Sequence, residues 1–157
     1  MQTPFNVKIT EKTCKNFFRC LGKFSLRDGQ VTQKEADTVL EIWKEWGVSR
    51  ETSQILLEEL IAGRDSEKTF EQLFDDFKRD MTPADRCSCD IVHAFVNIAY
   101  AREQQLPQKV RQRLIAIGKF LSREEFLQNL MSVNDDFCEP CEKQDKRKTK
   151  LEDFRFG

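Results

Sequence analysis

The segment most typical of a binding site is Asp28-Gly-Gln-Val-Thr-Gln-Lys-Glu35. It matches the second half of a calcium-binding EF-hand loop, which has an acidic residue, a glycine, an aliphatic residue and a final glutamate at this spacing. The preceding ligand positions would be Phe24 and Leu26, which have no side-chain oxygen, whereas calcium normally takes about six or more oxygen ligands. Two interpretations stay open: a divalent-cation site that uses Asp28 and Glu35, and a helix–turn–helix corner closed by a Thr32–Glu35 capping box. We favour the corner.

Several cysteines are candidate metal ligands or redox groups. Cys138-Glu-Pro-Cys141 has the spacing of a zinc knuckle, but a structural zinc ion requires four ligands and this pair supplies two. Cys87 or Cys89, together with His93, would complete the set if the C-terminal segment folds back. Redox pairs of this spacing usually sit in a thioredoxin-like α/β unit, and none is visible here. A zinc pair, a redox pair and an inert tail remain the three interpretations.

Acidic residues form a third candidate site on two expected helices: Glu58, Glu59, Asp75, Asp76 and Asp80. Such clusters are mostly solvated helix faces, and the alternative is a surface for a cation or a basic protein partner. Motifs for catalysis are missing from the sequence. The one histidine, His93, has no nucleophile elbow near it, and neither glycine-rich phosphate-binding motif occurs. We expect a protein that is not an enzyme.

The composition excludes further classes of protein. In 157 residues, 26 Lys and Arg stand against 27 Asp and Glu, and a net charge of -1 rules out the broad basic field of a general nucleic-acid binder. No stretch has the ~18 consecutive apolar residues of a membrane helix, and the N-terminus does not resemble a signal peptide. We therefore expect a cytoplasmic protein whose cysteines are thiols or metal ligands rather than disulfides.

Helices must position these candidate residues, because apolar residues recur throughout at three-and-four spacing. Residues with a capping side chain precede most of the expected helices: Thr32, Ser49, Ser66, Thr82 and Ser122. Two helices are expected to end at glycines, Gly47 and Gly63. No segment alternates like a strand. The predicted fold is all-α, a compact bundle of about seven or eight helices.

An internal repeat divides this bundle into two related halves. A shift of 75 residues aligns them without a gap and pairs Leu21 with Val96, Val39 with Leu114, Ile42 with Ile117 and Cys14 with Cys89. A duplication or a shared helical period explains this agreement, and both members of the cysteine pair are expected to be buried. We predict one helical domain over residues 1–132 and a charged linker or tail over 133–157.

A resemblance to the TerB-like domain rests on the stretch Leu21-Gly-Lys-Phe-Ser-Leu-Arg-Asp-Gly-Gln-Val-Thr-Gln-Lys-Glu35 and on Trp46-Gly-Val-Ser49. Ile98-Ala-Tyr-Ala101 resembles the second copy of the pattern, and Phe120-Leu-Ser-Arg-Glu-Glu-Phe126 resembles its closing stretch. Together these motifs extend over residues 14–131. The resemblance implies a non-enzymatic, all-helical domain with two related halves.

The resemblance also implies a function. TerB-like domains occur in tellurite-resistance and stress proteins, where metal binding at acidic sites is proposed, and at the front of DnaJ-like co-chaperones. Asp28 and Glu35 match the family's acidic corner, whereas Arg102-Glu-Gln104 replaces it in the second half, and Ala94 after His93 excludes a J-domain signature within this chain. We predict a module that binds a protein partner and is fused to or associated with a J domain. The alternative is a metal-binding stress or tellurite-resistance protein that uses zinc or calcium.

Overall fold

The computed structural model describes residues 11–25, 29–45, 50–81, 88–102, 105–136 and 148–153. Within them the helices are α1 (Glu11–Ser25), α2 (Gln33–Glu45), α3 (Arg50–Asp65), α4 (Phe70–Asp80), α5 (Ser88–Arg102), α6 (Gln108–Phe120) and α7 (Glu124–Asp136). The two short strands are β1 (Gln30–Thr32) and β2 (Lys148–Lys150), and the 3-10 helix η2 (Leu151–Asp153) follows β2 directly. The all-α prediction is therefore confirmed.

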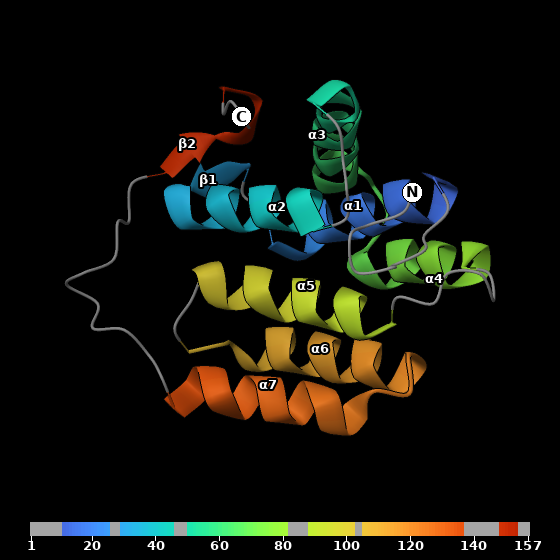
Figure 1. The fold of residues 1–157 in the computed structure, drawn as a ribbon. Helices are drawn as coiled ribbons and strands as arrows, with labels where there is room; N and C mark the ends of the chain where they lie inside the picture. Colours follow the sequence, from blue (N-terminus) through green and yellow to red (C-terminus); the bar gives the residue numbers. More distant parts are fainter. Residues whose placement is uncertain are drawn as a thin grey trace.

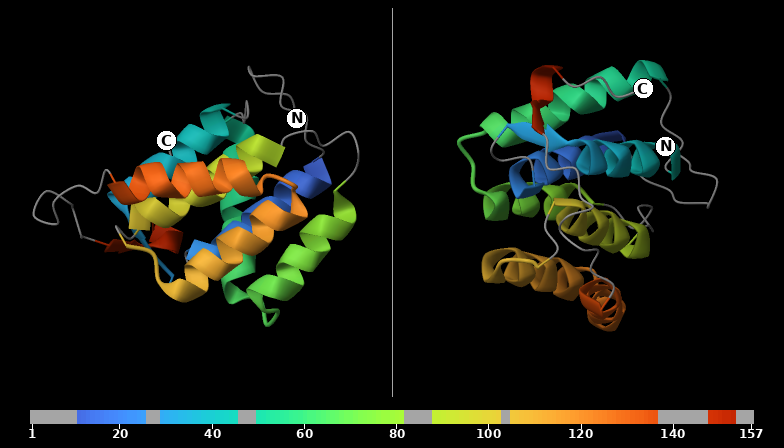
Figure 2. Two further views of the ribbon diagram at one scale, coloured as in Figure 1. Left: turned by 90° about the horizontal axis from the view of Figure 1, so that it is seen from below. Right: turned by 90° about the vertical axis from the view of Figure 1, so that its left-hand side faces the viewer.

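The α1 helix lies at the centre of the molecule and packs against α3, α4 and α5 (Figure 1). The α2 helix packs on α5, while α6 and α7 pack on each other and on α5. Figure 2 (right) shows the resulting layers, with α3 on one side of α1 and α2, and with α6 and α7 on the far side. None of the helices in the described part of the chain combines the length and apolar character that crossing a bilayer requires.

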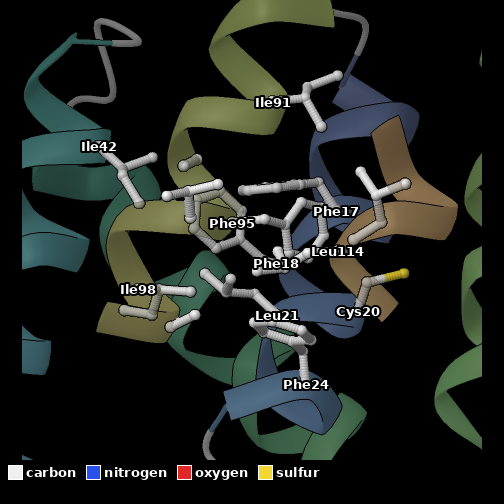
Figure 3. Packing of buried hydrophobic residues seen from close by; sticks show 14 of the residues in the cluster. Phe17, Phe18, Cys20, Leu21, Phe24, Ile42, Ile91, Phe95, Ile98 and Leu114 are labelled. Atoms are coloured by element: carbon white, nitrogen blue, oxygen red, sulfur yellow. The ribbon is translucent and has the colours of Figure 1, made fainter. Parts of the chain in front are cut away.

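A cluster of phenylalanine side chains fills the core where α1 and α5 meet (Figure 3). Phe17 of α1 and Phe95 of α5 are both fully buried, and their ring centroids lie 5.0 Å apart in an edge-to-face arrangement. Phe24 approaches the same Phe95 ring, with centroids 5.4 Å apart. Edge-to-face pairs place the positive ring edge on the negative face of the neighbour, so they add a directional term to simple burial.

The helix bounds follow the repeat expected from the sequence. Shifting α2 by 75 residues gives 108–120, which are the bounds of α6, and shifting α1 gives 86–100, close to those of α5. The paired residues Leu21 and Val96 are both fully buried. Cys14 is buried as expected, but Cys89 is only half-buried, because it lies in the first turn of α5. The expectation that Cys89 belongs to the core is therefore wrong.

Two expected helix boundaries also differ from the structure. The N-cap of α4 is Thr69 rather than Ser66: the Gln72 N–H donates to Thr69 Oγ1, and the Thr69 N–H donates to Gln72 Oε1. Gly63 does not end a helix, since α3 continues to Asp65. A Cβ on Gly63 would overlap the carbonyl oxygen of Arg19 in α1, so this glycine allows two helices to approach closely.

The C-terminal segment returns to the first half of the molecule. β2 pairs with β1 in an antiparallel ladder that places Gln30 opposite Lys150, and Leu151 after it is fully buried. The sequence pattern did not indicate these strands, because three residues are too few to show alternation. The division into a 1–132 domain and a 133–157 tail stays a prediction. However, α7 runs to Asp136, residues 148–150 pair with β1, and the side chain of Leu151 is buried.

Candidate functional site

The acidic corner of the first half places Glu35 in the first turn of α2, where its side chain is fully buried. The Thr32 N–H donates to Glu35 Oε1 at 3.1 Å, and the Glu35 N–H donates to Thr32 Oγ1 at the same distance. These two bonds satisfy donors that a helix start otherwise leaves without a partner. The capping box predicted from the sequence is therefore confirmed.

The other carboxylate oxygen of Glu35 faces a cation from the second half. Oε2 lies 3.5 Å from Nη1 of Arg102, whose side chain is 10% exposed at the end of α5. A carboxylate removed from water requires hydrogen bonds or a counter-charge, and Glu35 has both. Because each oxygen has a protein partner, this arrangement favours the structural corner over a cation site. Asp28, the other half of the predicted cation site, lies outside the described residues.

The predicted acidic surface is divided between two helices. Glu58 and Glu59 lie on α3, whereas Asp75, Asp76 and Asp80 lie on α4, and both helices pack on α1. Glu59 forms an ion pair with Arg19 of α1. Asp75 lies 3.4 Å from the Lys78 ammonium one turn further along α4. These neighbouring cations reduce the negative field that a basic partner would recognise.

The Asp76 and Asp80 carboxylates of α4 also have partners. Lys68 donates to Asp76 Oδ2 at 2.7 Å, and this hydrogen bond holds the pKa of the Asp76 carboxyl below its usual value. Asn16 Nδ2 donates to Asp80 Oδ2 at 2.6 Å and has the same effect on the pKa of Asp80, to which the Lys12 ammonium adds at 3.2 Å. The Asp76 and Asp80 side chains therefore remain ionised and connect α4 to Lys68, Asn16 and Lys12.

The described cysteines and His93 do not form a common metal site. Cys14 and Cys20 belong to the core, and burial raises the pKa of the Cys20 thiol, so it stays protonated. His93 on α5 has Asn97 as its neighbour, with Nε2 and Nδ2 3.4 Å apart. Over the described ranges, no three or more His, Cys, Asp or Glu side chains are arranged to hold a metal ion. The other candidate zinc ligands, Cys87, Cys138 and Cys141, fall on residues outside those ranges.

A groove between α4 and α6 was not predicted from the sequence. It has a volume of about 410 Å³ and an aromatic floor, to which Phe70 and Phe74 contribute. Figure 2 (left) shows α4 and α6 running alongside each other on this face. Phe120 at the end of α6 meets Phe74 edge-to-face, with ring centroids 5.8 Å apart, and is 39% exposed. We call this feature the α4–α6 groove.

Cations border the α4–α6 groove. The Lys78 ammonium lies 5.4 Å from the Phe74 ring centroid and 5.0 Å from that of Phe120. The Arg113 guanidinium lies 5.0 Å from the Phe70 centroid, within the range of a cation–π contact. The spacing of the phenylalanines along α4 indicated a core face, and Phe70 and Phe74 are buried as expected. The same spacing gave no sign of the groove beside that face.

Comparison with known proteins places this chain in a family. Residues 19–116 match the family model described as "Tellurite resistance protein TerB". The match begins within α1 and ends within α6, so it contains both Glu35 and Arg102 and covers more than half of the sequence. No curated protein and no solved structure matches the chain. The resemblance seen in the sequence is thereby confirmed, and the chain belongs to the TerB family.

Proposed function

We propose that this TerB-family chain is a non-catalytic helical module that binds a protein partner through the α4–α6 groove. The observation that carries the proposal is an exposed phenylalanine, Phe120, at the side of an aromatic groove bordered by cations. Aromatic side chains that lie partly in solvent beside a concave surface are typical anchors of protein interfaces. The setting we propose is a stress response or a DnaJ-like co-chaperone system in the cytoplasm.

The groove chemistry favours a particular type of contact. The Phe120 ring, packed against Phe74, offers exposed apolar area, on which a leucine or aromatic side chain of the partner would lose its contact with water. Lys109 also lines the groove and lies near Glu71, whose carboxyl pKa is lowered by a backbone hydrogen bond and by the charges of Arg113 and Lys109. A partner segment with one apolar anchor beside a carboxylate would match both the rings and these cations.

The alternative function is metal binding, with calcium or zinc as the ion. Its acidic version would require Glu35 to exchange its bonds with Thr32 and Arg102 for a cation. Its cysteine version would use Cys138 and Cys141. Since both carboxylate oxygens of Glu35 already have protein partners, we place the interaction function ahead of the acidic version.

Site-specific photo-crosslinking in the whole chain tests the interaction function. A photoreactive amino acid at Gln112, which lines the α4–α6 groove, is compared with the same group at the exposed Gln54 on α3. We expect one discrete protein adduct from position 112 and none from position 54. Adducts of equal yield at both positions, or no adduct at position 112, would contradict a partner site in this groove.

Once the adduct is identified, two matched variants separate binding from folding. Phe120→Ser removes the exposed ring at the side of the groove, while Val133→Ser removes a more exposed apolar side chain on α7. We expect at least a tenfold loss of affinity for the first variant and less than a twofold change for the second. Equal effects of the two substitutions would indicate a different binding surface.

A further inference from the structure

The β1 strand is too short to form a sheet by itself, and in the described part of the chain β2 is its one neighbour. Figure 1 shows β2 beside β1 at the start of α2, although along the chain β2 follows α7 on the opposite side of the molecule. A strand edge presents N–H and C=O groups that pair with the backbone of any extended segment whose side chains fit the site. The β1 edge therefore already binds an extended segment.

A buried leucine fixes the register of that segment. The Leu151 N–H donates to the Gly29 carbonyl at 2.8 Å, and the Leu151 side chain is fully buried. By contrast, the side chains of Thr149 and Lys150 are exposed. Recognition by strand addition works in this way, because the backbone bonds supply affinity and a socket for one side chain supplies selectivity.

An arginine beside the socket recognises the next residue. Arg64, near the end of α3, forms an ion pair with Glu152, and the Arg64 side chain is only 11% exposed. The same guanidinium lies next to Gly29, since a Cβ placed on that glycine would be 3.4 Å from Arg64 Nη1. The hydrogen bond from Arg64 lowers the pKa of the Glu152 carboxyl, which keeps this residue ionised.

We infer that the β1 edge, the Leu151 socket and Arg64 form a strand-docking site. Within the chain, residues 148–153 occupy this site. An extended partner segment with a leucine followed by an acidic residue binds there in their place. We call residues 148–153 the internal ligand. This site is separate from the α4–α6 groove, so it does not depend on the function proposed above. The partner is an extended peptide segment, because only an extended backbone continues the ladder that β2 makes with β1.

The internal ligand must compete with such a partner. The internal ligand and the partner segment make the same contacts with the site. Because the internal ligand is linked to the site, it acts at an effective concentration on the order of millimolar. A free peptide that binds with a dissociation constant of about 100 μM would therefore bind the native chain about tenfold more weakly than a chain whose internal ligand is displaced. This difference can be measured.

The test uses a labelled peptide of the sequence Lys-Thr-Lys-Leu-Glu-Asp and three forms of the full chain. In Leu151→Asp the internal ligand loses its anchor, and the peptide is expected to bind about tenfold more tightly than to the native chain. In the double variant Gln30→Cys/Lys150→Cys a disulfide can hold the internal ligand in place. The hydrogen bond from the Leu151 N–H to the Gly29 carbonyl makes Gly29 and Leu151 a hydrogen-bonded pair. Since the two types of pair alternate along an antiparallel ladder, the next pair, Gln30 and Lys150, is non-hydrogen-bonded, and the side chains of such a pair lie closer together.

The oxidised double variant is expected to bind no peptide, and reduction is expected to restore the native affinity. A peptide with aspartate in place of its leucine should not bind any form. Glu152→Lys, at a residue that is 47% exposed, provides a second opened form if Leu151→Asp unfolds the protein, because it removes the ion pair with Arg64. Equal peptide affinity for the native, opened and locked chains, or no binding to either opened chain, would overturn the inference.

Discussion

The carboxylate of Glu35 and the guanidinium of Arg102 meet at 3.5 Å and join the start of α2 to the end of α5. The residue equivalent to Glu35 in the second half is Val110, since 35+75=110. The second corner therefore has no carboxylate of its own at this position and instead contributes a cation to the first. An interaction between the two halves thus involves Arg102, one of the residues that replace the acidic corner in the second half.

Replacing Glu35 by Gln tests the importance of this ion pair. Gln keeps an oxygen that can accept from the Thr32 N–H, but it removes the negative charge that faces the largely buried Arg102. We expect the free energy of unfolding to fall by about 3 kcal/mol, the typical cost of removing one partner of a buried pair. Urea unfolding followed by circular dichroism measures this change.

A double-mutant cycle provides the control for this prediction. Arg102→Met should also destabilise the protein, and Glu35→Gln/Arg102→Met should lose less than the sum of the two single changes. Glu124→Gln, at an exposed carboxylate in the first turn of α7, should change the stability by no more than about 0.5 kcal/mol. Losses that simply add would show that Glu35 and Arg102 do not interact.

Local sequence patterns were sufficient for most of the fold. Apolar spacing predicted the helices, and the residues Thr32 and Glu35 predicted the capping box, because these features depend on neighbours within one turn. The expected helix end at Gly63 is wrong because it, too, was based on neighbours within one turn. A glycine near the end of a helical pattern is typical of a helix end, whereas its role here depends on Arg19, which lies far away in the sequence.

Alanine substitutions at the α1–α3 crossing test this close approach. A Cβ on Gly22 would overlap the carbonyl oxygen of Leu60, and a Cβ on Gly63 would overlap that of Arg19. Because backbone atoms cannot rotate away, we expect Gly22→Ala and Gly63→Ala each to destabilise the protein by about 3 kcal/mol, despite the better helix propensity of alanine. Thermal unfolding measures the effect.

A third glycine serves as the matched control. At Gly118 in α6, a Cβ would meet Cδ2 of Leu127 at 2.8 Å, and this side-chain atom can move. Gly118→Ala should therefore lower the melting temperature less than either substitution at the crossing. If all three substitutions had the same effect, helix propensity rather than the α1–α3 distance would govern these positions.

Tyr100, the single tyrosine of the chain, is expected to cause a loss of stability at alkaline pH. Burial raises the pKa of Tyr100, and its hydrogen bond to Asp135 Oδ1 at 2.7 Å raises it further. The unfolded chain releases this proton near the ordinary pKa of 10.0, whereas the folded chain keeps it. The contribution of Tyr100 is thus fully present below pH 10 and declines as the pH rises towards the folded pKa.

Ultraviolet absorbance of the phenolate measures this pKa directly, because Tyr100 is the one tyrosine present. In the native protein we expect ionisation well above pH 10 and, in denaturant, near pH 10. Tyr100→Phe should remove this part of the alkaline decline and lower the stability at neutral pH by about 1 kcal/mol through loss of the hydrogen bond. A native titration near pH 10 would contradict the buried, hydrogen-bonded assignment.

The sequence indicated less of the candidate sites than of the fold. The α4–α6 groove depends on how α6 lies against α4, and the docking of Leu151 depends on a segment far from β1 in the chain. Neither arrangement leaves a local pattern. The acidic residues were visible as a cluster, but Lys68, which pairs with Asp76, and Lys12, which pairs with Asp80, lie outside α4, so the cluster overstated the negative charge.

Calcium titration distinguishes the interaction function from its acidic metal-binding alternative. A calcium ion at the corner would have to displace the Thr32 N–H and Arg102 from the Glu35 carboxylate, and a cation held by few oxygens gains little in return. We therefore expect millimolar calcium to leave the melting temperature unchanged. If calcium binds the folded chain specifically, the melting temperature must instead rise with its concentration by mass action, and Glu35→Gln must abolish the rise.

Zinc requires its own measurement, because its candidate ligands Cys138 and Cys141 are thiols rather than carboxylates. Elemental analysis of the purified native chain is compared with that of Cys138→Ser/Cys141→Ser. The proposed interaction module predicts less than a tenth of a zinc ion per chain in both proteins. About one zinc per native chain that is lost in the variant would establish the cysteine pair as a metal site, since replacing two thiolates of a four-ligand site removes half of its bonds to the metal.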